Sequence, residues 1–145
     1  MKASCTLFSR FSPAAKRILR AAEQASRNHN HYYVGVEHVL LALLEEHDPA
    51  VDERLRAHGV ACDRAQEALR RALGTGDDRL WDGILVTPRV RSVVRLAESA
   101  VQPSALVEPV DLFDAIWEEG GSLAREILDA AGAAGNAADS HPVAG

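Results

Sequence analysis

Apolar side chains recur at helical spacing along most of this chain. Two stretches begin with a hydroxyl residue followed by proline, at Ser12 and at Thr87, a combination typical of helix starts. Behind each start the apolar residues return every third or fourth position, which predicts two amphipathic helices. These positions are Ala15, Ile18, Leu19, Ala22 and Ala25 in the first helix, and Val90, Val93, Val94, Ala97 and Val101 in the second.

Two further stretches are too apolar for a surface helix. The sequence YVGVEHVLLALLEE, residues 33–46, is apolar on nearly all sides until it reaches Glu45 and Glu46. Such a segment predicts a central, buried helix with a solvated end. The sequence VEPVDLFDAIWEE, residues 107–119, predicts a second central helix. Shorter helices follow, and we expect glycines to end them at Gly59, Gly74 and Gly132.

The order of these features occurs twice in the chain. SPAAKRILRAAEQA aligns with TPRVRSVVRLAESA, VGVEHVLLALLEE with VEPVDLFDAIWEE, and LRAHGV with LDAAGA, which indicates a duplicated unit. We therefore predict an all-α fold of two pseudo-symmetric helical repeats of about four helices each, with the second repeat truncated. The predicted domain spans residues 8–133, with repeat one at 11–74, a linker at 75–86, repeat two at 87–133, and a disordered tail at 134–145.

Composition narrows the class of protein. The 145 residues suffice for one domain with a core, and the net charge of −5 argues against binding led by nucleic-acid phosphates. Cys5 and Cys62 form neither a disulfide framework nor a zinc motif. Because no apolar run approaches about 20 residues and the first residues contain no signal-peptide core, we expect a cytoplasmic location.

These residues resemble the N-terminal repeat domain of the Clp ATPases, the ring-shaped unfoldases of bacterial proteolysis and disaggregation. The resemblance is carried by YVGVEHVLLALL, SPAAKRILRAAEQA, LRAHGV and TPRVRSVVRLAESA, and it covers residues 8–133. It implies two pseudo-symmetric four-helix repeats that bind other chains. The printed sequence contains no G-x-x-x-x-G-K-[ST] motif, so we expect a recognition domain without its motor.

The sequence departs from the family at three further places. Val36 stands where the family has threonine or serine, so we expect the loss of a helix cap at a cost of about 1 kcal/mol. In repeat two, Val110 and Asp111 replace the Glu-His pair of repeat one. The eighth helix of the family has no clear counterpart, which is why we predict a truncated second repeat.

Glu37 and His38, which begin the central apolar run, admit several interpretations. As a catalytic pair they lack a nucleophile at fixed spacing. As a metal ligand His38 would need His29 and His31, which lie in a predicted loop without a carboxylate at ligand spacing. In a structural role Glu37 complements the helix dipole, and His38 packs or bonds between the repeats. The sequence thus predicts no catalytic residue, metal site or cofactor, and leaves structural and binding roles open.

The binding interpretation comes from the resemblance. In some members of the family this glutamate and the hydroxyl residue that begins the first helix bind phosphoarginine, a degradation mark. A carboxylate suits a guanidinium, and the N–H groups of a helix N-terminus suit a phosphate. The resemblance implies that Ser12 and Glu37 keep one such half-site. Thr87 and Val110 do not, because a valine side chain accepts no hydrogen bond.

A second candidate surface lies between the two repeat-opening helices. In relatives, a phenylalanine at the place of Phe8 and another before the second Thr-Pro form an apolar cleft for substrates, adaptors and, in actinobacterial members, cyclic-peptide antibiotics. Val86 takes the second place here, so we expect a shallower cleft. The expected lining is Phe8, Phe11, Lys16, Leu19, Glu23, Val86, Arg91 and Val94.

That surface also has a structural interpretation, in which Phe11 is a hydrophobic staple and the charged residues form an ordinary solvated helix face. Of the two tryptophans, we expect Trp117 in the core and Trp81 over the gap between the repeats.

The predicted function is a non-catalytic domain that binds peptides or proteins in Clp-dependent proteolysis or quality control. It could be an adaptor that presents substrates to a Clp unfoldase–protease. The alternative is a decoy that sequesters cyclic-peptide antibiotics or competes with the N domain of a Clp ATPase. We expect no membrane and no nucleic-acid partner. A small hydrolase is disfavoured because no nucleophile is placed, and a transcription regulator because no basic recognition helix is present.

Overall fold

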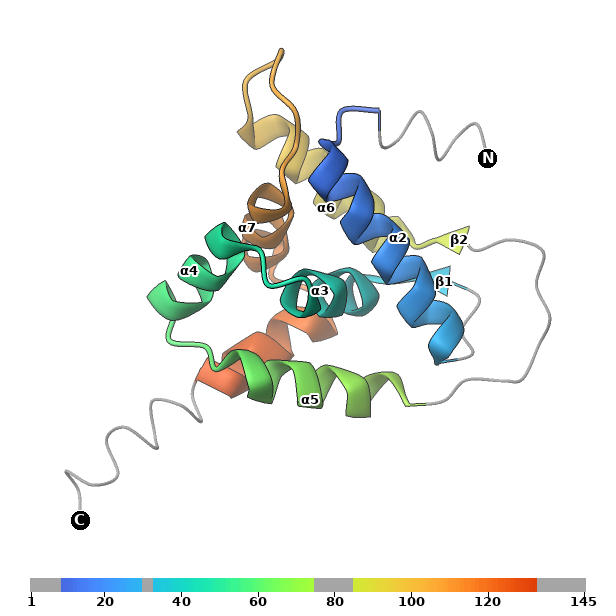
Figure 1. Ribbon diagram of the computed structural model, residues 1–145, viewed down its shortest axis with the longest axis vertical. Coiled ribbons are helices and arrows are strands. Elements are labelled where there is room, and N and C mark those ends of the chain that lie inside the picture. Colours follow the sequence, from blue (N-terminus) through green and yellow to red (C-terminus); the bar gives the residue numbers. More distant parts are fainter. Residues whose placement is uncertain (1–8, 30–32, 75–84, 133–145) are drawn as a thin grey trace.

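The computed structural model describes residues 9–29, 33–74 and 85–132, and within them the chain is built almost entirely of helices (Figure 1). The all-α prediction is confirmed, although two very short strands were missed. Repeat one contains α2 (Pro13–Asn28), β1 (Tyr33–Val34), α3 (Val36–Glu45), α4 (Pro49–Ala57) and α5 (Cys62–Leu73). Repeat two contains β2 (Leu85–Val86), α6 (Pro88–Ala100), α7 (Pro109–Glu119) and a helical segment at 123–132.

Several predictions concern residues outside the described part of the chain. They are the place of Phe8, the cover expected from Trp81, most of the linker at 75–86, and the disordered tail at 134–145. The last two residues assigned to the linker, Leu85 and Val86, form strand β2 instead. In the part of the chain that is described, no helix is long and apolar enough to cross a bilayer.

Helix α3 forms the centre of the molecule, where it packs against α2, α4, α5, α6 and α7 (Figure 1). Every residue from Val39 to Leu44 is buried, whereas Glu45 and Glu46 are exposed. This pattern confirms the prediction of a central helix with a solvated end. Its counterpart α7 buries Leu112, Phe113 and Ile116 in the same core. The two repeats thus share one hydrophobic interior.

The first helix of each repeat begins as its sequence predicts. The hydroxyl oxygen of Ser12 accepts a hydrogen bond from the N–H of Ala15 at 3.1 Å. The hydroxyl oxygen of Thr87 accepts the equivalent bond from the N–H of Val90 at 3.3 Å. Proline follows both caps and loses no hydrogen bond at the first helical position.

The backbone just before each of these helices pairs with the other repeat. Strand β1 runs parallel to β2, with Val34 opposite Val86, and Phe11 makes an isolated parallel bridge with Val107. In consequence the N–H of Ser12 donates to the carbonyl of Val107 at 2.9 Å, and the N–H of Thr87 donates to the carbonyl of Val34 at 3.1 Å. The pairing is therefore crossed between the repeats.

The two central helices, α3 and α7, also share a hydrogen bond at their starts, from the backbone N–H of the cap residue to a side chain three residues later. The N–H of Gly35 donates to Nδ1 of His38 at 2.9 Å, and the N–H of Glu108 donates to a carboxylate oxygen of Asp111 at 2.9 Å. His38 is fully buried, and this hydrogen bond lies within repeat one rather than between repeats. The cap position is Gly35 rather than Val36, which is the buried first residue of α3. No side chain caps the start of this helix, in agreement with the expected loss of a cap.

At one end of the repeat interface, α4 meets α7 through polar and aromatic contacts. Arg54 forms an ion pair with Asp114, at 3.0 Å between Nε and Oδ1. The ring of His58 stacks on the ring of Trp117 at 3.8 Å between centroids, and the guanidinium of Arg125 lies 4.0 Å from the centroid of the Trp117 ring. Trp117 is therefore half-buried at this junction, and the expectation that it lies in the core was wrong.

Candidate functional site

At the other end of the repeat interface, α2, α3, α6 and α7 surround a hollow whose lining is wholly apolar. Leu19 is half-buried, and every other lining residue is buried. The lining residues are Phe11, Leu19, Val36, Val39, Val90, Val93, Val94, Leu112 and Ile116. Since both repeats contribute, the hollow exists only when the two repeats pack together. An apolar lining of this kind gives water no hydrogen-bond partner.

The hollow is shallow. Its volume is about 240 Å³ when the part open to solvent is counted, but the space that the centre of a water-sized group can occupy is only about 10 Å³. That space corresponds to a single water molecule or a methyl group. A larger apolar group can rest at the mouth, against Leu19, but it cannot enter without moving a lining side chain.

The helix faces beside the hollow repeat the same residue types. Seventy-five positions separate the two repeat-opening stretches, so Lys16 corresponds to Arg91, Leu19 to Val94, Arg20 to Arg95 and Glu23 to Glu98. On each helix these four residues occupy positions i, i+3, i+4 and i+7, which lie on one side of an α-helix. Each helix therefore offers an aliphatic residue to the hollow with cations beside it.

The structure brings only part of the predicted cleft together. Phe11, Leu19 and Val94 line the hollow, and Phe11 and Val94 are buried there. Lys16, Glu23 and Arg91 are exposed and Val86 is half-buried, and none of these four residues is part of the lining. Whether any of them contacts a ligand stays a prediction.

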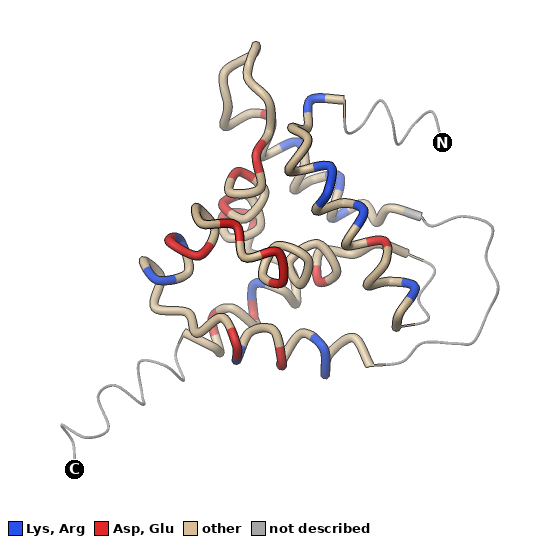
Figure 2. The backbone as a smooth tube through the Cα atoms, viewed as in Figure 1, with Lys and Arg blue, Asp and Glu red and all other residues tan. Residues whose placement is uncertain are grey.

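Helices α2 and α6 together carry seven cations and two acidic residues, whereas α3 and α7 together carry six acidic residues and no Lys or Arg (Figure 2). Some acidic residues of these helices form ion pairs with arginines on other helices, as in the pairs Arg54–Asp114 and Arg70–Glu45. By contrast, no ion pair joins the exposed cations of α2 and the outer face of α6 to any residue at 9–29, 33–74 or 85–132. These cations are Lys16, Arg17, Arg20, Arg27, Arg91 and Arg95.

The predicted phosphoarginine half-site is changed by the crossed pairing. Ser12 lies against Val107 at the start of α7, whereas Thr87 lies against Val34 at the start of α3. Glu37 lies in the first turn of α3, three residues after Val34, whose carbonyl accepts the hydrogen bond from Thr87 at the start of α6. The hydroxyl oxygens of Ser12 and Thr87 both serve as helix caps. Phosphoarginine binding itself stays a prediction.

Sequence reasoning missed a group of three potential ligands in repeat one. His47, Asp52 and Cys62 lie in three different elements, and their ligand atoms are within 4.8 Å of one another. Their spacing along the chain matches no metal or catalytic motif, so only the fold reveals them. Burial first, and then the charges of Asp52 and Asp63, raise the pKa of the Cys62 thiol, which is the opposite of what a nucleophilic cysteine requires.

Comparisons with known proteins place these features in context. The model of the Clp repeat (R) N-terminal domain matches residues 10–130 of the chain. A ClpA homologue from Cyanidium caldarium, an ATP-binding subunit of an ATP-dependent Clp protease, is 27% identical over 125 residues. ClpC/MecB of Bacillus subtilis, a negative regulator of genetic competence, is 26% identical over 134 residues.

These relatives are much longer than this chain. The matched regions are 85% and 91% of this chain but only 15% and 16% of the ClpA homologue and of ClpC/MecB. Among solved structures, the N-domain of ClpV from Vibrio cholerae aligns with a TM-score of 0.62 at 21% identity, covering 79% of this chain and 70% of that one. At that identity the similarity establishes the fold alone.

Proposed function

The chain belongs to the family of Clp repeat N-terminal domains, and from this premise we propose that it is a non-catalytic binding domain for peptides or partner proteins in Clp-dependent proteolysis or quality control. The proposed contact surface is the hollow between α2, α3, α6 and α7. One observation carries the proposal: an apolar hollow lies between two helix faces whose exposed cations have no ion-pair partner among the described residues.

The size of the hollow limits the ligand. A space of about 10 Å³ for the centre of a water-sized group accepts a methyl group, so the proposed ligand places a small aliphatic side chain at the mouth. An aromatic ring would have to displace Leu19, the half-buried residue at the mouth. The contact area is small, and small interfaces are typical of weak and transient association. Such association suits a domain that must pass its ligands on.

The charge beside the hollow limits the ligand further. Lys16 and Arg20 on α2 face solvent, as do their counterparts Arg91 and Arg95 on α6. Acidic residues on both sides of the aliphatic side chain would complement these cations, and basic residues would be repelled. We therefore propose that acidic peptides with a short aliphatic centre bind better than basic ones, although the chain as a whole carries a net charge of −5.

Fluorescence anisotropy with two labelled peptides tests this proposal. The peptides share the centre Ala-Val-Ala and differ only in their flanks, which are glutamates in one and lysines in the other. We expect the acidic peptide to bind at least about tenfold more tightly at low salt, with the difference shrinking as ionic strength rises. Replacing both Arg20 and Arg95 by glutamate should remove the preference.

Arg64→Glu on α5 is the matched control, because Arg64 is exposed and lies outside the hollow. It makes the same Arg→Glu exchange at one site instead of two, a charge change of −2 rather than −4, and leaves the proposed surface unaltered, so the preference for the acidic peptide should persist. Equal binding of the two peptides by the unmodified chain would refute the charge preference, and no binding of either peptide would refute the peptide-binding proposal.

The link to a Clp system needs a separate test. Recovery of a Clp unfoldase or its protease from cell lysate on the immobilised chain, and its loss with the Arg20/Arg95 variant, would support a role in substrate presentation. Binding of cyclic peptides without any Clp protein would instead favour the decoy.

A further inference from the structure

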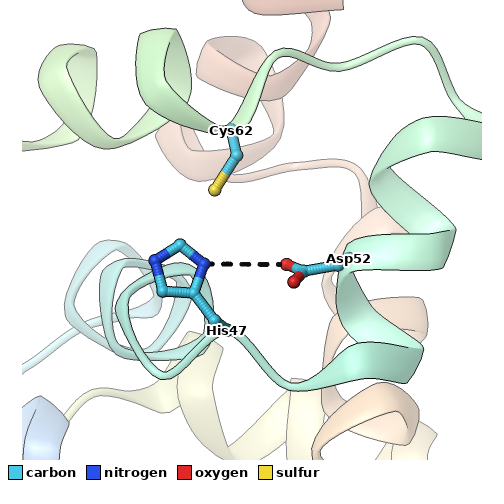
Figure 3. A group of neighbouring side chains, drawn as sticks. All are labelled: His47, Asp52 and Cys62. Carbon is cyan, nitrogen blue, oxygen red and sulfur yellow. Dashed lines mark ion pairs between the residues drawn. The ribbon is translucent and has the colours of Figure 1, made fainter.

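A group of three side chains with metal-binding atoms lies at one corner of repeat one, outside the hollow (Figure 3). His47 lies in the turn between α3 and α4, Asp52 in the first turn of α4, and Cys62 at the first position of α5. Their ligand atoms point toward one another and lie within 4.8 Å, and Nδ1 of His47 is 4.0 Å from Oδ1 of Asp52. Three consecutive elements thus contribute one ligand each.

The three groups are close, and His47 and Asp52 lie at ion-pair distance (Figure 3). A distance of 4.0 Å between His47 and Asp52 is too long for a hydrogen bond. The Sγ atom of Cys62 has only a weak contact, at 4.0 Å, with the carbonyl of Leu44. The side chains of His47 and Asp52 are 60% and 31% exposed, so an ion in solvent can reach them.

The backbone of His47 contributes to this arrangement. Its φ is 52°, and no other described residue except glycine has a positive φ. A left-handed conformation is uncommon for a residue with a side chain, although histidine tolerates it better than most. The sharp turn that results carries the imidazole from the end of α3 toward α4 and α5.

We propose that His47, Asp52 and Cys62 bind a divalent transition metal, with Zn²⁺ the best match to their chemistry. One imidazole, one carboxylate and one thiolate are all ligands that Zn²⁺ accepts, and three protein ligands leave the fourth tetrahedral position for water. In such a site the ligand atoms lie about 3.5 Å apart, so the side chains close by about 1 Å around the ion. The ion ties the α3–α4 turn to the start of α5.

The proposal is independent of the peptide-binding function, because none of the three residues lines the hollow. A bound metal would stabilise the folded chain by mass action, since the unfolded chain does not hold the three ligands together. It would rigidify repeat one at the corner away from the hollow. We therefore expect the metal to raise the melting temperature while leaving peptide affinity unchanged.

Titration of the full chain with Co²⁺, a spectroscopic substitute for Zn²⁺, tests the site directly. We expect a thiolate-to-cobalt charge-transfer band that saturates with one ion per chain and disappears when Zn²⁺ is added. His47→Ala, Asp52→Asn and Cys62→Ser should each weaken Co²⁺ binding at least about tenfold. Cys5→Ser and His29→Ala are the matched controls, which should bind as tightly as the unmodified chain.

A second measurement keeps the test decisive if a variant folds poorly. In the Cys5→Ser chain, Cys62 is the remaining thiol, and Zn²⁺ should slow its alkylation by iodoacetamide. A cobalt spectrum without the thiolate band, or alkylation of Cys62 at the same rate with and without Zn²⁺, would overturn the proposal.

Discussion

The two ends of the repeat interface are built in opposite ways. At the α4–α7 end the repeats are joined by the ion pair of Arg54 with Asp114 and by the stacked rings of His58 and Trp117. At the α2–α6 end they leave a shallow hollow lined by apolar residues. The contrast shows that one set of residues, at the α4–α7 end, holds the repeats together, whereas a different set, at the α2–α6 end, leaves part of their interface open to other molecules. One end can stay open because the other end is closed.

The largest expected effect is on the closed end. Trp117→Ala removes an aromatic ring that contacts both His58 and Arg125, and we expect it to lower the free energy of unfolding by about 3 kcal/mol. Urea unfolding measures this loss, and Trp117→Phe, which keeps an aromatic face, should lose less than half as much. If Trp117→Ala also weakened binding of the acidic peptide as strongly as the Arg20/Arg95 variant, the two ends would not be independent.

A smaller effect on stability is expected at the open end. Leu19→Ala shortens a half-buried residue at the mouth of the hollow, and we expect it to cost about 1 kcal/mol in unfolding. The same change should weaken binding of the acidic peptide about tenfold, which anisotropy measures. Leu96→Ala is the control, because Leu96 is 37% exposed on α6 and does not line the hollow. Equal peptide binding by both variants would show that the hollow is not the contact surface.

The smallest effect is expected for the ion pair of the closed end. The hydrogen bond and the charge of Asp114 raise the pKa of Arg54, but both side chains are well exposed to solvent. Exposed pairs contribute little to stability and are screened by salt. We expect Arg54→Met to shift the urea midpoint slightly at low ionic strength and not at all in about 1 M salt. A large shift that persists in salt would mean that this pair, rather than Trp117, closes the interface.

Most of the fold could be predicted because its signals are local. The caps at Ser12 and Thr87 precede regular apolar spacing, and the run that ends at Glu45 is too apolar to lie on a surface. Strands β1 and β2 are two residues each, which is too short for an alternating pattern to be recognised. The crossed pairing of Phe11 with Val107 leaves no local signal, since it depends on residues far apart in the chain.

The candidate site was predicted less well, for the same reason. Leu19 and Val94 follow the helical apolar spacing, and the family resemblance assigned them and Phe11 to the interface. Val36 was assigned to the cap position of α3, whereas Gly35 occupies that position and its N–H donates to the side chain of His38. The same acceptor role falls to Asp111 in repeat two, so an imidazole and a carboxylate are equivalent there. The alignment of the repeats placed Asp111 at the position of His38, but it gave no sign that the two side chains accept the same hydrogen bond.

The crossed hydrogen bonds have a consequence for how such a chain could arise. The backbone N–H groups of Ser12 and Thr87 donate to backbone carbonyls of the opposite repeat, those of Val107 and Val34. In a single copy of the unit, the backbone N–H before the first helix and the backbone carbonyl before the central helix would have no hydrogen-bond partner. A second identical copy, related by a two-fold axis, would supply both partners. Duplication within one gene therefore converts the contact of a symmetric homodimer into an intramolecular one, whose effective concentration no longer falls on dilution.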